Sequence, residues 1–117
     1  MVLVVLSSVT MGAQGAWAQA APTAFNMCKA CHKIEPGKHG LGPSLAGVFG
    51  TKTGTNWPDF KYSDAHKKAN LVWNDATLTK YLGNPKGTIL GEKKAFAGLR
   101  NPDEVRAVVA YLKTLRK

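Results

Sequence analysis

The residues with the most specific chemistry are Cys28, Cys31 and His32, which together form a C-x-x-C-H pattern. This pattern is typical of the covalent attachment of a c-type haem. One turn of helix presents both thiols to one porphyrin edge, and the next residue offers an imidazole to the iron. Because the chain holds two cysteines and both lie here, the sequence predicts two thioether bonds and one axial ligand.

Two other assignments fit a bare C-x-x-C pair, namely a redox-active dithiol and half of a zinc site. Zinc would need further thiols or well-spaced histidines, and only His39 and His66 are left. A thioredoxin-like dithiol would lie within a βαβ pattern, which is not visible here. Haem attachment is therefore the assignment that we favour.

Residues 1–20 have the pattern of an export signal. The first ten residues are mostly Val and Leu, and A-x-A cleavage options follow that end at Ala18 and Ala20. The apolar run is too short for a permanent membrane span. No Lys or Arg precedes it, which leaves open a true start upstream of Met1. Cleavage after Ala20 leaves residues 21–117 as one small domain. We place this domain in the periplasm, because covalent haem attachment belongs to the outer side of a bacterial inner membrane.

All sixteen Lys and Arg and all seven Asp and Glu follow the expected signal, so the exported domain keeps the net charge of +9. Such a surface favours acidic partners. Nucleic acid is not the expected partner, since no recognised reading motif accompanies the lysines. The alternative is that these charges bind no partner and only keep the surface solvated.

The helix signals predict an all-α fold of short helices joined by long loops rich in Gly and Pro. Residues 24–32 are expected to form a helix that carries the haem cysteines, and residues 37–54 are expected to be loop. Two further helices are expected over 63–69 and 74–82, because each range begins with a good N-cap residue.

The last helix has the clearest signals. Asn101 is the expected N-cap, and Pro102 suits the first helical position. Asp103 and Glu104 lie where the helix dipole favours negative charge. An apolar stripe at helical spacing, which we expect to pack against the first helix, consists of Val105, Val108, Val109, Leu112 and Leu115.

From Phe25 to its C-terminus, the chain resembles the class I cytochromes c, in particular the cytochrome c2 and mitochondrial-type branch. Beyond C-x-x-C-H, the resemblance rests on GPSL at 42–45, GVFGTKTG at 47–54, FKYSDA at 60–65, Trp73, Tyr81, NPK at 84–86 and AFAGL at 95–99. It implies an all-α fold around one haem. It also implies a monomeric electron carrier without enzymatic activity.

The resemblance assigns roles to matching residues. His32 is the proximal iron ligand, and the Pro43 carbonyl accepts a hydrogen bond from its other ring nitrogen, which orients the imidazole. Tyr62 and Trp73 match residues that hydrogen-bond a haem propionate. His39 matches a histidine that ties two loops together, away from the iron.

The main departure from the family concerns the distal iron ligand. The family has a methionine in a segment that reads roughly P-G-T-K-M-x-F-A-G, whereas residues 90–98 read LGEKKAFAG and place Lys94 at the methionine position. Met1 and Met11 lie in the expected signal. Met27 adjoins Cys28, on the wrong side of the loop to reach the distal face of the haem. A thioether ligand is therefore absent.

Three assignments of the sixth iron position stay open. In the first, Lys94 binds as a neutral amine, which burial and a cationic metal both favour. In the second, Lys93 or Lys86 binds instead. In the third, every lysine stays solvated and the position is open or holds water. An open position would suit the binding of small gases or weak peroxidase activity, with Tyr81 and His66 as distal hydrogen-bonding candidates.

Two more changes fall on the distal side. His66 stands where the family usually has a buried Asn, so it either rebuilds the hydrogen bonds there or binds iron itself. Glu92 replaces a threonine and is expected to pair with a lysine, which would oppose loss of that amine's proton. The first helix looks short, which puts its docking on the last helix in question.

The expected function is one-electron transfer. Lysines around the exposed haem rim would steer encounters with acidic faces of an electron donor and an acceptor, such as membrane complexes or dehydrogenases. These lysines are Lys29, Lys33, Lys86 and Lys93. An amine ligand favours ferric iron, so we expect a lower reduction potential than in methionine-ligated relatives.

Overall fold

The computed structural model describes residues 20–117, and the expected export signal lies outside this range except for Ala20. Residues 20–117 contain no β-strand, and their only strand-like pairing is one bridge between Lys52 and Val72. No helix of this part is long and apolar enough to cross a membrane. The fold is therefore all-α, as predicted.

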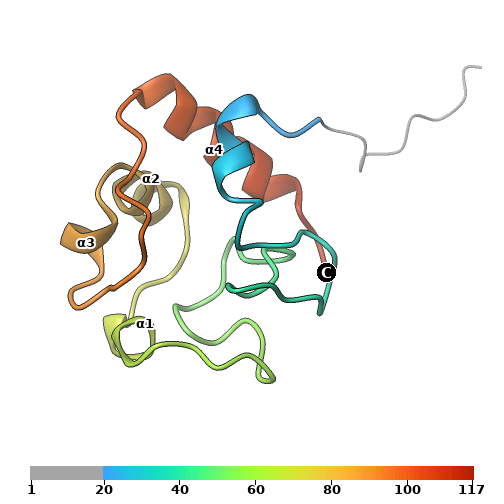
Figure 1. Cartoon of the computed structure of the whole chain (residues 1–117), viewed down its shortest axis with the longest axis vertical. Helices are drawn as coiled ribbons and strands as arrows, with labels where there is room; N and C mark the ends of the chain where they lie inside the picture. Colours follow the sequence, from blue (N-terminus) through green and yellow to red (C-terminus); the bar gives the residue numbers. More distant parts are fainter. Residues whose placement is uncertain (1–19) are drawn as a thin grey trace, which may run out of the picture.

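Loops separate the helical elements, and the longest lies between η1 and α1, whereas only Asn84 lies between α2 and α3 (Figure 1). Residues 37–54 contain neither helix nor strand, as expected. The elements in chain order are the 3-10 helix η1 (Thr23–Met27) and the α-helices α1 (Asp64–Ala69), α2 (Asp75–Gly83), α3 (Pro85–Thr88) and α4 (Pro102–Thr114).

Three helices begin where the sequence predicts, because an N-cap side chain accepts a hydrogen bond from a backbone N–H of the first turn. Ser63 caps α1 at 3.2 Å, and Asn101 caps α4 at 2.9 Å. At α2, the Asn74 side chain accepts from the Thr77 N–H and the Thr77 hydroxyl accepts from the Asn74 N–H, both at 2.9 Å. This reciprocal pair is a capping box.

The segment that carries the cysteines is less helical than predicted. A helix was expected over 24–32, but η1 ends at Met27 and turns follow it. In these turns the Cys28 carbonyl accepts from the N–H of both Cys31 and His32. The N-cap of η1, Pro22, makes no side-chain hydrogen bond, and short uncapped segments rarely propagate as α-helix.

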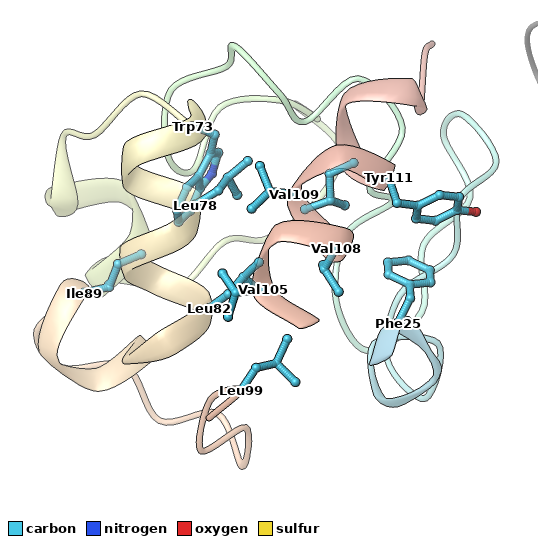
Figure 2. Close-up of a cluster of buried hydrophobic side chains, with 11 residues drawn as sticks. Phe25, Trp73, Leu78, Leu82, Ile89, Leu99, Val105, Val108, Val109 and Tyr111 are labelled. Atoms are coloured by element: carbon cyan, nitrogen blue, oxygen red, sulfur yellow. The ribbon is translucent and has the colours of Figure 1, made fainter. Parts of the chain in front are cut away.

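Helix α4 packs against two elements. Phe25 of η1 is fully buried and meets Tyr111 edge-on, with ring centroids 4.8 Å apart. On another side of α4, Leu78 and Leu82 of α2 complete the core (Figure 2). The docking of the first helix on the last one is therefore formed, although η1 is short.

The predicted apolar stripe of α4 forms most of this core. Val105, Val108, Val109 and Leu112 are buried. Leu115 is half-buried and lies just beyond the helix end at Thr114. Because α4 faces both η1 and α2, its buried surface is wider than the stripe.

Candidate functional site

One hydrogen bond and one glycine fix the imidazole of His32. The distance from Nδ1 to the Pro43 carbonyl oxygen is 2.7 Å, and because a carbonyl only accepts, Nδ1 carries the proton. Nε2 is then the nitrogen that is left to bind a metal. A Cβ at Gly42 would come within 2.3 Å of the ring Cε1, so a larger residue there would displace the ring.

The protonation of His32 suits a metal ligand. Burial lowers its pKa, and the nearby positive charge of Lys94 acts in the same direction, while the hydrogen bond to Pro43 opposes both. The imidazole is therefore held in its neutral form, which is the form that coordinates a metal.

The two thiols do not have the properties of a redox-active dithiol. Cys28 is half-buried, Cys31 is exposed, and no disulfide joins them. Burial raises the pKa of the Cys28 thiol, and the neighbouring Cys31 raises it further, whereas catalytic dithiols have a lowered thiol pKa. Within residues 20–117, no three His, Cys, Asp or Glu side chains gather as they would around a metal ion.

His39 ties two loops together, as the resemblance implies. Its Nδ1 accepts from the Ser44 N–H at 3.0 Å, so Nε2 carries the proton that it shares with Asp59, also at 3.0 Å. Two residues that the sequence analysis missed, Trp57 and Asn56, also hold these loops together by hydrogen bonds. Trp57 donates its indole N–H to the Ser44 carbonyl at 2.9 Å, and Asn56 donates to the Ala46 carbonyl at 3.0 Å.

The two candidate propionate ligands lie on different parts of the chain. The Tyr62 hydroxyl accepts from the Trp57 N–H at 2.9 Å, which leaves its own proton free to donate. Trp73 is 7% exposed, and its ring lies edge-on to Tyr81 at 5.0 Å. Both residues thus keep a polar group on a ring that is at least partly enclosed, as a propionate contact requires.

Glu92 is the centre of a buried polar cluster. Its side chain is 1% exposed, and its Oε1 accepts a hydrogen bond from His66 Nε2 at 3.1 Å and another from the Tyr81 hydroxyl. His66 therefore makes a hydrogen bond at its position, which fits the first of the two roles expected for it.

The ion pair expected between Glu92 and a lysine is not formed among the described residues, but Glu92 does raise the pKa of Lys94 and so opposes loss of its proton, as expected. Among residues 20–117, the side chains that donate hydrogen bonds to the Glu92 carboxyl group are His66 and Tyr81. Helices α1 and α2 hold His66 and Tyr81 in place, and ordering these two rings costs less conformational entropy than ordering a long lysine side chain.

His66 and Tyr81 are the hydrogen-bond donors of this cluster. Burial raises the pKa of Tyr81, and its hydrogen bond to Glu92 raises it further. Burial also lowers the pKa of His66, and Lys94 adds to this effect, although Glu92 opposes it. At neutral pH, a neutral phenol and a neutral imidazole therefore both donate to the Glu92 carboxyl group.

Lys94 acts electrostatically on both imidazoles. Its positive charge lowers the pKa of His32 and of His66. Lys94 is exposed, but the protein atoms around its amine partly desolvate it and lower its pKa, an effect that Glu92 opposes. A lowered pKa favours the neutral amine, which is the form that binds a metal.

These residues fit a c-type haem. The chain offers two thiols at the right spacing, a neutral imidazole with one free nitrogen, and an amine whose charge reaches that imidazole. Two buried side-chain oxygens, Oδ1 of Asn56 and Oε2 of Glu92, have no hydrogen-bond partner among the described residues.

Comparisons with known proteins find similar sequences. The family model for cytochrome c matches residues 18–116. Cytochrome c2 iso-2 of Magnetospirillum fulvum is 62% identical over 95 residues, which cover 81% of this chain and 98% of the relative. Cytochrome c2 of Rhodoplanes tepidamans is 57% identical over 99 residues, which cover 84% of this chain and all of the relative.

A solved structure is also similar. Cytochrome cH from Methylobacterium extorquens superposes with a TM-score of 0.73 at 45% sequence identity. The match covers 78% of this chain and 91% of the other.

Proposed function

Because this chain belongs to the cytochrome c family, we propose that it is a periplasmic one-electron carrier whose haem iron is bound by His32 and Lys94. Like its family, it is an electron-transport protein with covalent haem c. The observation that carries the axial assignment is the position of Lys94 in residues 90–98, where the family has its methionine, together with the fixed orientation of His32; the positive charge of Lys94 also lowers the pKa of His32.

Each site residue has a distinct task in this proposal. Cys28 and Cys31 attach the cofactor, and the Pro43 carbonyl holds His32 in one orientation. Tyr62 and Trp73 donate to a propionate. When bound, the haem supplies an iron that changes between ferrous and ferric by one electron. The protein keeps the ligands fixed, so that little rearrangement accompanies the transfer.

The alternative function, a gas binder or weak peroxidase with an open sixth position, has less support. It needs free hydrogen-bond donors on the distal side. The protons of both candidates, His66 and Tyr81, are already donated to Glu92.

Electron paramagnetic resonance of the ferric holoprotein tests the axial assignment. We expect a low-spin signal at neutral pH that is lost as the pH falls, because acid competes with iron for the amine lone pair. Lys94→Ala is expected to be high-spin at neutral pH. The matched changes Lys93→Ala and Lys86→Ala should stay low-spin; a high-spin wild type, or loss of the signal in Lys93→Ala or Lys86→Ala, would contradict the assignment.

The net charge of +9 predicts a salt-dependent reaction with partners. The proposed partners are acidic faces of redox proteins, met by a monomer through a small contact. Raising the ionic strength from about 0.01 M to about 0.15 M shortens the range of steering severalfold. The second-order rate with an acidic redox protein should therefore fall roughly tenfold or more in stopped-flow measurements, whereas the rate with a neutral small-molecule reductant should not change.

A further inference from the structure

One carboxyl oxygen of Glu92 accepts two hydrogen bonds, and the other accepts none from the described residues. Its Oε1 receives both His66 and Tyr81. Its Oε2 is buried and has no hydrogen-bond partner among residues 20–117. A buried acceptor without a donor is costly, so a group that arrives when the site is complete should supply the donor.

A lysine bound to a metal carries suitable donors. The neutral amine gives its lone pair to the metal and keeps two N–H bonds. In a partly dry site these N–H groups need acceptors. On the proximal side, the equivalent need of His32 is met by the Pro43 carbonyl.

The chain places Glu92 close to this donor. Glu92 precedes Lys94 by two residues in a loop that turns at Gly91, where φ is +87°. Because two donors on α1 and α2 hold Oε1, the carboxyl group is restrained from rotating and Oε2 keeps one direction.

We propose that Glu92 Oε2 accepts a hydrogen bond from the Lys94 amine when that amine binds iron, so that Glu92 is a positioning residue for the distal ligand. This inference rests on the axial role of Lys94 proposed above. Such an acceptor orients the ligand and strengthens its bond to the metal, as outer-shell acceptors do for histidine ligands.

A second effect of Glu92 would weaken the bond between Lys94 and iron. A carboxylate also stabilises a free, protonated lysine and so works against ligation. If that attraction dominates, removing Glu92 strengthens the bond between Lys94 and iron. If the hydrogen bond dominates, removing Glu92 weakens it. One substitution therefore separates the two effects.

The experiment measures how easily imidazole displaces Lys94 from the ferric holoprotein. Glu92→Leu removes the acceptor at similar volume, and Glu92→Gln keeps a weaker, uncharged one. We expect the Leu variant to bind imidazole about tenfold more tightly than wild type, since a hydrogen bond to a charged group is lost, and the Gln variant to lie between the two. If the Leu variant does not fold, the Gln variant carries the same test.

Two controls make the result specific. Val108→Ala lowers stability within the core, away from the distal cluster, and should leave imidazole affinity unchanged. Proton exchange of the Lys94 N–H groups in the ferrous protein, followed by NMR, should speed up in Glu92→Leu but not in Val108→Ala. A merely structural role of Glu92 would not produce this difference.

The outcomes separate this inference from the proposed function. If Lys94→Ala binds imidazole far more tightly than wild type while both Glu92 variants bind it with wild-type or weaker affinity, Lys94 is the ligand and the inference is wrong. If Lys94→Ala behaves like wild type, the axial assignment itself fails, and the inference fails with it.

Discussion

Replacement of Cys28 and Cys31 by serine is expected to give a protein that carries no covalent haem and does not keep its fold. Small domains bury too little apolar surface to be stable without help, and here a large apolar cofactor provides that help. The loss should remove most of the roughly 5–15 kcal/mol that stabilises a typical domain. Mass spectrometry under denaturing conditions and far-UV circular dichroism check both parts of the prediction.

The matched control for this experiment lies inside the same motif. Lys29→Ser makes a substitution between the two cysteines without removing a thiol, so its covalent haem and its unfolding midpoint should stay near those of the wild type. A double serine variant with the haem mass still attached, or with the wild-type unfolding curve, would contradict the role given to the motif.

The helix starts were predictable because their signals are local. An N-cap side chain and the N–H that it binds lie within three residues of each other, as at Ser63, Asn74 and Asn101. The same signals were present but unused at α3, where Asn84 accepts from the Gly87 N–H and Pro85 takes the first position. These local signals were enough to predict α3 from the sequence.

The first helical segment was predicted less well, because no local signal marks its end. The cysteine spacing suggested one helix over 24–32, but the turn bonds to the Cys28 carbonyl replace its second half. Tyr111 was also missed as a core residue, because the partner that buries it, Phe25, lies far away in the sequence.

The site also has one part that the sequence predicts and one part that it does not. The attachment motif is contiguous, so its chemistry follows from spacing alone. The Glu92 cluster is not contiguous, since His66 lies 26 residues and Tyr81 lies 11 residues from Glu92. In the sequence, Glu92 stands among lysines, which suggests an ion pair. Only the packing of α1 and α2 shows that two neutral donors, His66 and Tyr81, bind its carboxyl group instead.

Replacement of Lys94 by methionine is expected to raise the reduction potential. A thioether is a softer donor than an amine and stabilises ferrous iron, whereas the amine favours ferric iron. Axial ligands set haem potentials over a span of about 0.8 V, and we expect this exchange to account for on the order of 0.1 V of it. A shift of this size exceeds a factor of ten in the equilibrium, which corresponds to about 59 mV for one electron. Spectroelectrochemical titration of both holoproteins measures it.

A charge-matched control removes the main ambiguity of that measurement. Lys93→Met deletes the same charge one residue away and should change the potential far less than Lys94→Met. The buried carboxyl group of Glu92 would face a thioether that cannot donate to it, so a Glu92→Thr change added to Lys94→Met should raise the potential further. Equal potentials in Lys93→Met and Lys94→Met would show that charge, and not the axial ligand, sets the difference, and Lys94 would then no longer be assigned to the iron.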